Sequence, residues 1–379
     1  SSWPLFCAAS CRLMFDPPAA RADFERAYAL FGDAGDLAGR WLSWAGIAES
    51  FVFGWDSLAD FDPWIDELDN LLAEGRGFPS PAVEARTLAG GVALMLHRPD
   101  HPLLPIWADR ALMLLRSRQT KDHVATLAHF AGFHDMWRGH TQALDAVLEA
   151  ARASDAPMLP LGRILLGLLE LVLANFRGDR PRVEASFAAA LAVATEHGVH
   201  VMDAPLIQNA ALAALAGGDA NRLAELIGMA RPILMPGRWL EASFQEYLEA
   251  GLALLLGDVV KARVFADRAA ALVEGQGMPL LMMHICLFET HLDILEGKYE
   301  AAAGKLPILL QDARQARCDI YIAASRFGQA HVALMTGDAA KAVEALREAL
   351  AIGARWNYGH LFLYAAPEAE SLLCAQALQ

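Results

Sequence analysis

The sequence has few cysteines, few basic residues and no long apolar run. Five cysteines in 379 residues, with no secretory signal before them, form no disulfide framework and predict reduced thiols in a cytoplasmic protein. Lys and Arg number 31 against 45 Asp and Glu, which excludes the basic surface that binding to nucleic-acid phosphates requires. Although 55% of the residues are hydrophobic, no stretch of about 18 residues lacks a charge or a strong breaker, which excludes a membrane span.

The motifs of common catalytic sites are also missing. There is no His-Glu-x-x-His, no Gly-x-Ser-x-Gly and no Gly-x-Gly-x-x-Gly after a strand. The fragment nearest to a phosphate-binding loop, Gly297-Lys298-Tyr299, lacks the rest of that motif. Cys7 and Cys11 have the spacing of half a metal site, but no second pair follows, so we expect two buried thiols. We therefore predict a chain that is not an enzyme, with no catalytic residues, no metal and no cofactor of its own.

A glycine recurs at a nearly constant interval between apolar segments. The steps between successive glycines are 39, 40, 39, 40 and 40 residues, and the positions are Gly139, Gly178, Gly218, Gly257, Gly297 and Gly337. Four of these glycines are followed by Asp. Glycine accepts the left-handed backbone that ends a helix, and Asp accepts hydrogen bonds from the free amides that start one. Each interval is therefore predicted to hold two helices joined by a tight turn.

Small residues and prolines extend this pattern. Twelve positions after each turn glycine the residue is usually alanine, which lets helices approach closely: Ala151, Ala190, Ala230, Ala269, Leu309 and Ala349. Upstream, Pro follows a possible capping residue at Asp16-Pro17, Asp62-Pro63 and His101-Pro102, as at the first turn of a helix. The pattern resembles the tetratricopeptide (TPR) repeat, with a longer period than the TPR unit of about 34 residues. We predict an all-α, right-handed TPR-like superhelix, an α-solenoid of about nine helix-turn-helix units.

The chain is predicted to form a single superhelical domain over residues 1–379. Residues 1–120 hold weaker, tryptophan-rich repeats, residues 121–355 hold the regular repeats, and residues 356–379 form a last, unpaired helix. We attribute the N-terminal tryptophans to core packing, with an aromatic-lined pocket in this third of the chain as the alternative. The chain opens with Ser1-Ser2 rather than Met, so we expect it to be a fragment of a longer protein.

Several N-terminal segments resemble a known family. They are Trp3-Pro4-Leu5-Phe6, Phe15-Asp16-Pro17, the segment Ala22–Phe31, Trp44-Ala45-Gly46 and Phe61-Asp62-Pro63-Trp64-Ile65. Together they resemble the TPR-like superhelical region of MalT-like bacterial transcriptional activators, which belong to the signal-transduction ATPase (STAND) class. The resemblance covers essentially the whole chain.

In that family the superhelix receives an inducer and passes the signal to an NTPase domain and a DNA-binding domain. Neither of those two parts is in this sequence, so the resemblance implies an isolated sensor region. ATP is then expected only in the NTPase domain of a parent protein. The implied partners are a small-molecule inducer or a regulatory protein, with self-association in the parent and no direct contact with nucleic acid or membrane. The alternative is a generic TPR-like scaffold that binds a peptide or protein.

The first helix of each unit carries a polar stripe. Apolar residues dominate at three, six, nine and ten positions before the turn glycine, and polar residues at four, eight and eleven. Because first helices line the concave surface of a TPR-like superhelix, we predict this stripe as a groove for a polar or cationic ligand, bound between Glu249 and Arg326. The alternative is a solvated face. The predicted residues are Glu170, Glu246, Glu249, Glu289, Asp293, Arg326 and Gln329.

Two histidines occupy matching positions in neighbouring units. His291 and His331 are one period apart, so stacked repeats are predicted to place their imidazoles near each other. Such a coupled pair senses pH or holds a metal ion, whereas the alternative is a pair of buried, hydrogen-bonded histidines.

Overall fold

The computed structural model describes residues 1–117, 123–154, 158–360 and 375. Its N-terminal helices are α1 (Ser2–Arg12), α2 (Pro17–Ala34), α3 (Leu37–Gly54), α4 (Asp62–Ala73), α5 (Pro81–Ala93) and α6 (Leu103–Ser117). The next six are α7 (Val124–Arg138), α8 (Thr141–Arg152), α9 (Pro160–Phe176), α10 (Arg180–His197), α11 (Asp203–Ala216) and α12 (Ala220–Ala230). The last six are α13 (Trp239–Leu255), α14 (Val259–Val273), α15 (Pro279–Leu295), α16 (Tyr299–Gln315), α17 (Asp319–Met335) and α18 (Ala339–Trp356).

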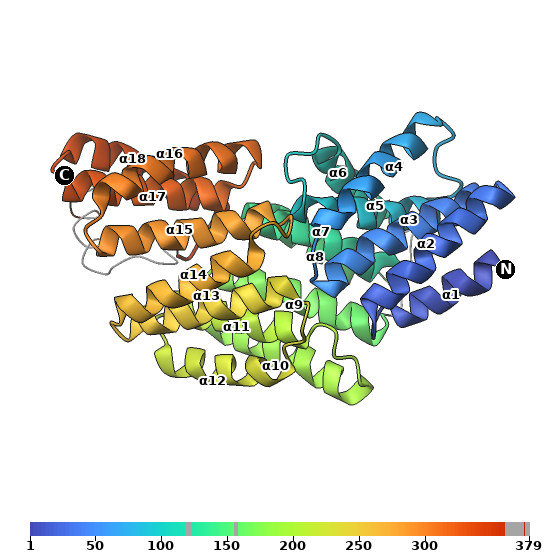
Figure 1. Cartoon of the computed structure of the whole chain (residues 1–379), viewed down its shortest axis with the longest axis horizontal. Helices are drawn as coiled ribbons and strands as arrows, with labels where there is room; N and C mark the ends of the chain where they lie inside the picture. Colours follow the sequence, from blue (N-terminus) through green and yellow to red (C-terminus); the bar gives the residue numbers. More distant parts are fainter. Residues whose placement is uncertain (118–122, 155–157, 361–374, 376–379) are drawn as a thin grey trace.

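These elements confirm the predicted all-α fold. In the described residues the chain forms 18 α-helices with short 3-10 turns and no β-strand. Each odd-numbered helix packs against the even-numbered helix that follows it, so α1 to α18 form nine pairs. Figure 1 shows α1–α6 at one end, α16–α18 at the other, and α9–α14 between them. None of the described helices is long and apolar enough to cross a membrane.

The predicted turn glycines end the first helices. Their φ angles are all positive, from 69° at Gly178 to 83° at Gly337. The aspartates that follow four of them cap the next helix, because a carboxylate oxygen accepts a hydrogen bond from the amide three residues later at 2.9–3.2 Å. Such a cap contributes about 1 kcal/mol to helix stability. The same device joins α2 to α3 at Gly35-Asp36, which does not fit the 39-residue period and was not predicted.

The small residues of the second helices are buried at the interface within each pair. Ala151 and Ala269 are completely inaccessible to solvent, and the other four positions of this series are also buried. The absence of large side chains there allows the close approach of the helices. Of the N-terminal tryptophans, Trp41 and Trp44 are buried in the core, as predicted. Cys7 and Cys11 contradict the prediction of buried thiols: α1 packs against α2 and α3 with one face, and both cysteines lie on its exposed part.

The superhelix is tight enough for distant segments to meet. Near the N-terminal end the amide of Leu58 donates to the carbonyl of Gln276 at 2.8 Å, and the amide of Leu240 donates to the carbonyl of Trp55 at 3.2 Å. These two bonds join the turn after α3 to the region of α13–α15. Segments that are about 185 to 220 residues apart in the sequence are therefore neighbours in the fold.

The C-terminal segment also returns to the middle of the chain. The predicted helix at 356–379 does not form at its start: Trp356 ends α18, and residues 357–360 are not helical, whereas Ala375 is. Asn357 adopts a left-handed conformation with φ of 54°, which stops the helix. The Tyr358 hydroxyl then donates to the carbonyl of Gly139 at 2.7 Å, and the Gly359 amide donates to the carbonyl of Phe176 at 2.6 Å. Most of the remainder of the predicted helix, residues 361–374 and 376–379, lies outside the described residues.

Candidate functional site

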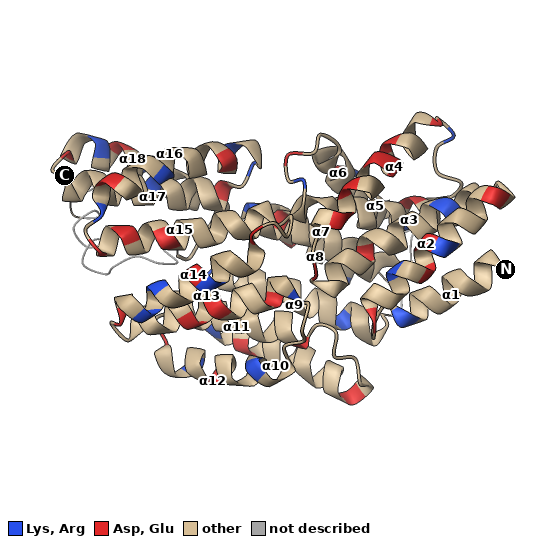
Figure 2. Cartoon of the chain, viewed as in Figure 1, with Lys and Arg blue, Asp and Glu red and all other residues tan. Residues whose placement is uncertain are grey.

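Most of the predicted polar stripe lies in ion pairs between helices. Glu170 on α9 pairs with Arg152 on α8 at 2.6 Å, and Glu249 on α13 pairs with Arg231, just after α12. Glu246 lies 3.9 Å from Arg268 of α14. Each cation comes from or directly after a second helix, so these carboxylates face the outer layer of helices. Figure 2 shows the acidic and basic residues interspersed along the helices in this view.

Arg326 and Gln329 lie apart from these pairs, on α17. Arg326 pairs with Glu348 of α18 at 2.6 Å and donates a hydrogen bond to the Gln329 amide oxygen at 2.8 Å. Both side chains line an open hollow of about 460 Å³ between α16, α17 and α18. Glu249 pairs with Arg231 and is not among the residues that line this hollow.

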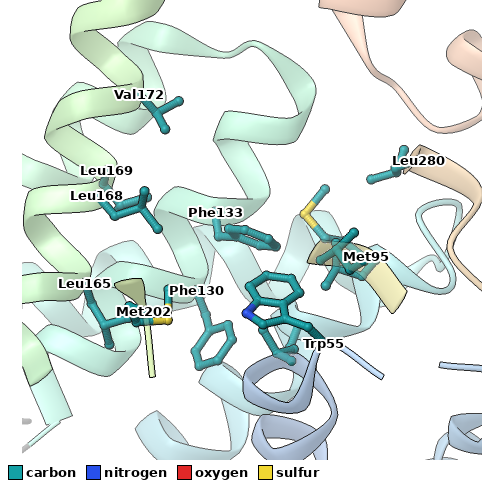
Figure 3. Close-up of a cluster of buried hydrophobic side chains, with 14 of the residues drawn as sticks. Trp55, Met95, Phe130, Phe133, Leu165, Leu168, Leu169, Val172, Met202 and Leu280 are labelled. Atoms are coloured by element: carbon teal, nitrogen blue, oxygen red, sulfur yellow. The ribbon is translucent and has the colours of Figure 1, made fainter. Parts of the chain in front are cut away.

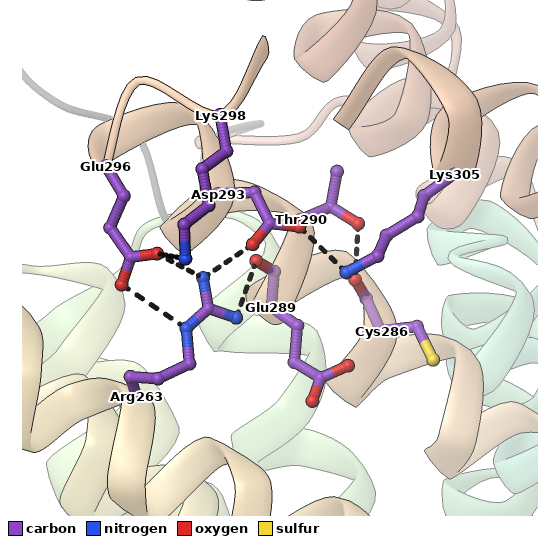
Figure 4. Close-up of polar contacts among 8 residues, drawn as sticks. All are labelled: Arg263, Cys286, Glu289, Thr290, Asp293, Glu296, Lys298 and Lys305. Carbon is purple, nitrogen blue, oxygen red and sulfur yellow. Dashed lines mark hydrogen bonds and ion pairs between the residues drawn. The ribbon is translucent and has the colours of Figure 1, made fainter. Parts of the chain in front are cut away.

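Asp293 is the most deeply buried member of the stripe. Its carboxylate accepts from Arg263 and from Lys305, both at 2.7 Å, although only 4% of the residue is exposed. Figure 4 shows Arg263 between Asp293 and Glu296. Its Nη1 donates to the backbone carbonyl of Glu289 at 3.3 Å. Burial raises the pKa of the Glu289 carboxyl. This network connects α14, α15 and α16.

A pocket of about 130 Å³ lies on the concave side of the superhelix. We call it the central pocket. Its walls come from the ends of α3 and of the described C-terminal segment and from every first helix between α7 and α17. The lining residues are Trp55, Phe133, Met136, Trp137, Leu168, Val172, Asn175, Phe176, Pro205, Gln208, Asn209, Leu212, Leu240, Glu241, Phe244, His284, Ile320, Tyr321 and His360.

The lining positions follow the apolar row of the repeat. Many stand three, six, ten or thirteen residues before a turn glycine, as do Met136, Phe133 and Val172. None of the seven residues of the predicted polar stripe is among them. The pocket is lined largely by apolar residues of the first helices. Of the N-terminal tryptophans, Trp55 and Trp137 line this pocket, but most of its walls come from residues beyond the N-terminal third of the chain.

Aromatic side chains form much of the wall. The ring of Phe133 lies 6.2 Å from that of Trp55 and 6.1 Å from that of Trp137, measured between centroids. On the other side, the rings of Phe244 and His284 stack at 5.9 Å. Figure 3 shows Trp55 and Phe133 beside the buried side chains of α9 and next to the core. The pocket is therefore continuous with the hydrophobic core.

The amide side chains in the lining have partners within the protein. The Gln208 side chain donates to the backbone carbonyl of Glu241 at 2.8 Å, and that of Asn209 donates to the carbonyl of Pro205 at 2.8 Å. His360 Nε2 forms a hydrogen bond of 2.9 Å with the backbone carbonyl of Asn175. These bonds hold the polar lining in place.

The ionisable side chains that line the central pocket are either paired with an opposite charge or uncharged at pH 7. Glu241, 2% exposed, accepts a hydrogen bond of 2.6 Å from Arg238. Burial raises the pKa of Glu241 to about 7, although Arg238 opposes the change. Burial lowers the pKa of His284 to about 3, so this imidazole is neutral at pH 7. Burial also lowers the pKa of His360. The lining therefore presents one paired carboxylate and two neutral imidazoles.

The two histidines predicted to be neighbours are close together. The rings of His291 and His331 lie 6.4 Å apart between centroids, which confirms their predicted proximity. Burial, with a smaller contribution from His331, lowers the pKa of His291 to about 3, and burial also lowers the pKa of His331. Among the described residues no group of three or more His, Cys, Asp or Glu side chains is placed to hold a metal ion.

These helix pairs define the protein as a TPR-like α-solenoid with a pocket on its concave side. No family model and no curated protein matches the sequence. Among solved structures, the chain is similar to a Rap protein complexed with competence and sporulation factor. The TM-score is 0.55 at 12% identity, and the match covers 89% of this chain and 99% of the Rap chain. At this identity the similarity shows the fold alone.

Proposed function

We propose that this chain is the ligand-sensing region of a bacterial transcriptional regulator, and that its ligand binds in the central pocket. One observation carries the proposal: a single pocket is lined by every first helix from α7 to α17, by Trp55 and by His360. A bound molecule therefore contacts segments that are far apart in the sequence. The regulatory role is supported by the resemblance of the N-terminal segments to MalT-like activators.

Ligand binding in the central pocket would be coupled to the contacts that hold distant segments of the superhelix together. His360 belongs to the segment that ties the end of α18 to α9, and the carbonyl of Trp55 ties the turn after α3 to Leu240 on α13. Both residues line the central pocket. We call the superhelix closed when these two contacts are made and open when they are broken. A ligand that binds the closed form more tightly shifts the equilibrium toward it, and the size of the shift is set by the difference in affinity for the two forms. In a parent protein this shift would be the signal.

A non-enzymatic role is consistent with the lining residues. The central pocket holds one carboxylate, Glu241, which is already paired with Arg238, and its lining includes no serine or cysteine nucleophile. We place the protein in the cytoplasm, where the free thiols of Cys7 and Cys11 on its surface remain reduced.

A scaffold that binds a protein or peptide is the second candidate. The observation that favours it is the similar Rap structure, which is described as complexed with competence and sporulation factor. In this case the concave side receives part of a partner rather than an inducer. The two candidates differ in which molecules stabilise the isolated chain.

Thermal unfolding against a panel of metabolites and short peptides tests the proposal. A molecule present at 100 times its dissociation constant adds about 2.7 kcal/mol to the free energy of unfolding. The variant Leu212→Trp fills the central pocket and should abolish the shift, whereas Val264→Trp, at an exposed position on α14, should retain it. Stabilisation by peptides alone would favour the scaffold. A shift that survives in Leu212→Trp would contradict binding in the central pocket.

A further inference from the structure

Building on the proposed function, we propose that the ligand of the central pocket is an uncharged aromatic molecule with one ring or two fused rings. The proposal rests on three properties of the lining: its charge, its hydrogen bonding and its shape. Nothing in the sequence pattern indicated this class, since the polar stripe predicted a polar or cationic ligand.

The charge of the lining favours a neutral ligand. Glu241, the carboxylate of the lining, is buried and bonded to Arg238 at 2.6 Å, so each charge already has its counter-ion. The buried imidazole of His284 is neutral at pH 7, and it is held near the Tyr321 hydroxyl at 3.4 Å. An ionised ligand would lose its hydration without gaining an opposite charge from the lining, which is strongly unfavourable.

The hydrogen bonding of the lining favours a ligand with few polar groups. The Gln208 and Asn209 side chains each donate to a backbone carbonyl within the protein. His360 Nε2 is likewise engaged by Asn175. Trp55 Nε1, Trp137 Nε1 and His360 Nδ1 have no partner among the described residues, so the ligand can carry one or two polar groups that meet them. A strongly polar ligand would compete with the bonds above and leave its own groups, or those of the protein, without partners.

The shape of the central pocket favours flat rings. Trp55, Phe133 and Trp137 line one part, and Phe176, Phe244 and Tyr321 line the remainder. Aromatic rings pack against one another in offset or edge-to-face arrangements, which a flat ligand can continue. The volume of about 130 Å³ is close to that of an engineered apolar cavity of about 150 Å³ that holds benzene. The pocket is partly open to solvent, so a second ring can extend beyond this volume.

A matched series of naphthalenes tests the class of ligand. The probes are 1-naphthaleneacetamide, which is neutral, 1-naphthaleneacetate, which is an anion of nearly the same shape, and 1-naphthylmethylammonium, which is a cation. Their binding to the full chain is measured by isothermal titration calorimetry at pH 7.5. We expect the amide to bind at least ten-fold more tightly than either ion.

Variants locate the binding site. Leu212→Trp should abolish binding of the amide, and Val264→Trp should leave it unchanged. Circular dichroism checks that both variants fold, and Leu212→Phe, a smaller change, replaces the first variant if it does not fold. In Leu212→Phe the amide should bind at least ten-fold more weakly than in the wild type.

The outcomes separate this inference from the proposed function. If either ion binds as tightly as the amide and Leu212→Trp abolishes that binding, the central pocket remains a ligand site and only the ligand class is wrong. A cation that binds most tightly would indicate recognition by the aromatic faces. If none of the three probes binds at millimolar concentration, the inference is also overturned, whereas the proposed function is still decided by the broader panel.

Discussion

The imidazole of His140 stacks on the indole of Trp356, with ring centroids 4.3 Å apart and planes 17° from parallel. His140 precedes α8 and Trp356 ends α18, so this contact joins the fourth helix pair to the ninth. Asp319 contacts both rings, at 2.5 Å from Trp356 Nε1 and 3.6 Å from His140 Nε2. The Thr141 hydroxyl donates to the backbone carbonyl of Trp356. The end of the solenoid is thereby fixed to its middle, next to the central pocket.

Removal of the Trp356 side chain should loosen this closure. We expect Trp356→Ala to lower the free energy of unfolding by about 2 kcal/mol, less than the 3–5 kcal/mol of a fully buried aromatic residue, because Trp356 is only half-buried. Urea denaturation measures the change. The matched control is Trp239→Ala, since Trp239 is 37% exposed and should cost less. Equal losses in the two variants would show that the closure contributes little.

Two glycines in open surroundings should respond to alanine in opposite directions. Gly337 has φ of 83° and Gly304 lies inside α16, and an added methyl group meets no atom within 4 Å at either position. Gly337→Ala should destabilise by about 1 kcal/mol because the left-handed backbone is unfavourable for alanine. Gly304→Ala should stabilise by about 0.5–1 kcal/mol through helix propensity. Thermal unfolding of both variants measures this, and a loss of stability in Gly304→Ala would contradict the placement of Gly304 inside α16.

Two carboxylates of the polar stripe should differ in their contribution to stability. Asp293 is buried and neutralises Arg263 and Lys305, so Asp293→Asn leaves Lys305 without its carboxylate and Arg263 with Glu296 alone, and should cost about 3 kcal/mol. Glu170 and Arg152 are both partly exposed, so Glu170→Gln should cost less than about 1 kcal/mol. Chemical denaturation at low and moderate salt compares them. A cost for Asp293→Asn as small as that for Glu170→Gln would mean that water reaches the network.

Acid should destabilise the fold through its buried histidines. The pKa of His291 is about 3 in the folded chain and about 6.5 in the unfolded chain, so below pH 6.5 the unfolded state binds a proton that the native state does not. Stability therefore falls as the pH decreases from about 6.5 toward 3, with a slope of about 1.4 kcal/mol per pH unit for this residue.

The variant His291→Gln should reduce that slope. Above pH 7.5 the difference in stability between variant and wild type should be constant, which serves as the internal control. Between pH 6 and 4 the difference should shift progressively in favour of the variant, as followed by urea denaturation at each pH. If the stability curves of variant and wild type are parallel over the whole pH range, His291 has the same pKa in the native and the unfolded chain, which would contradict the lowered pKa.

The repeat architecture could be predicted because its determinants are local. A turn glycine such as Gly337, the capping carboxylate of Asp338 and a small residue such as Ala349 each act within one helix pair. The proximity of His291 and His331 followed from the same period, because stacked repeats place equivalent positions side by side. The nine pairs followed from counting these signals.

The location of the candidate site could not be predicted in the same way. The sequence shows which row of each first helix is polar, and we interpreted that row as the groove. In the structure Glu170 and Glu249 turn toward cations of the outer helices, whereas Phe133 and Val172, from the apolar row, line the central pocket. A repeat pattern gives two faces of a helix but does not state which one the superhelix encloses.

The sequence by itself determined the helices, their turns and their pairing, since hydrogen bonds and packing between neighbours specify each of them. Only the tertiary structure decided that the superhelix closes, through contacts such as His140 with Trp356 and Trp55 with Leu240. These contacts join residues separated by several repeats, and they depend on the small rotation between successive pairs added over the whole chain. Because of that accumulated rotation, apolar and aromatic side chains from several repeats face one another and line the central pocket. Within a single repeat the same side chains cannot be told from core residues.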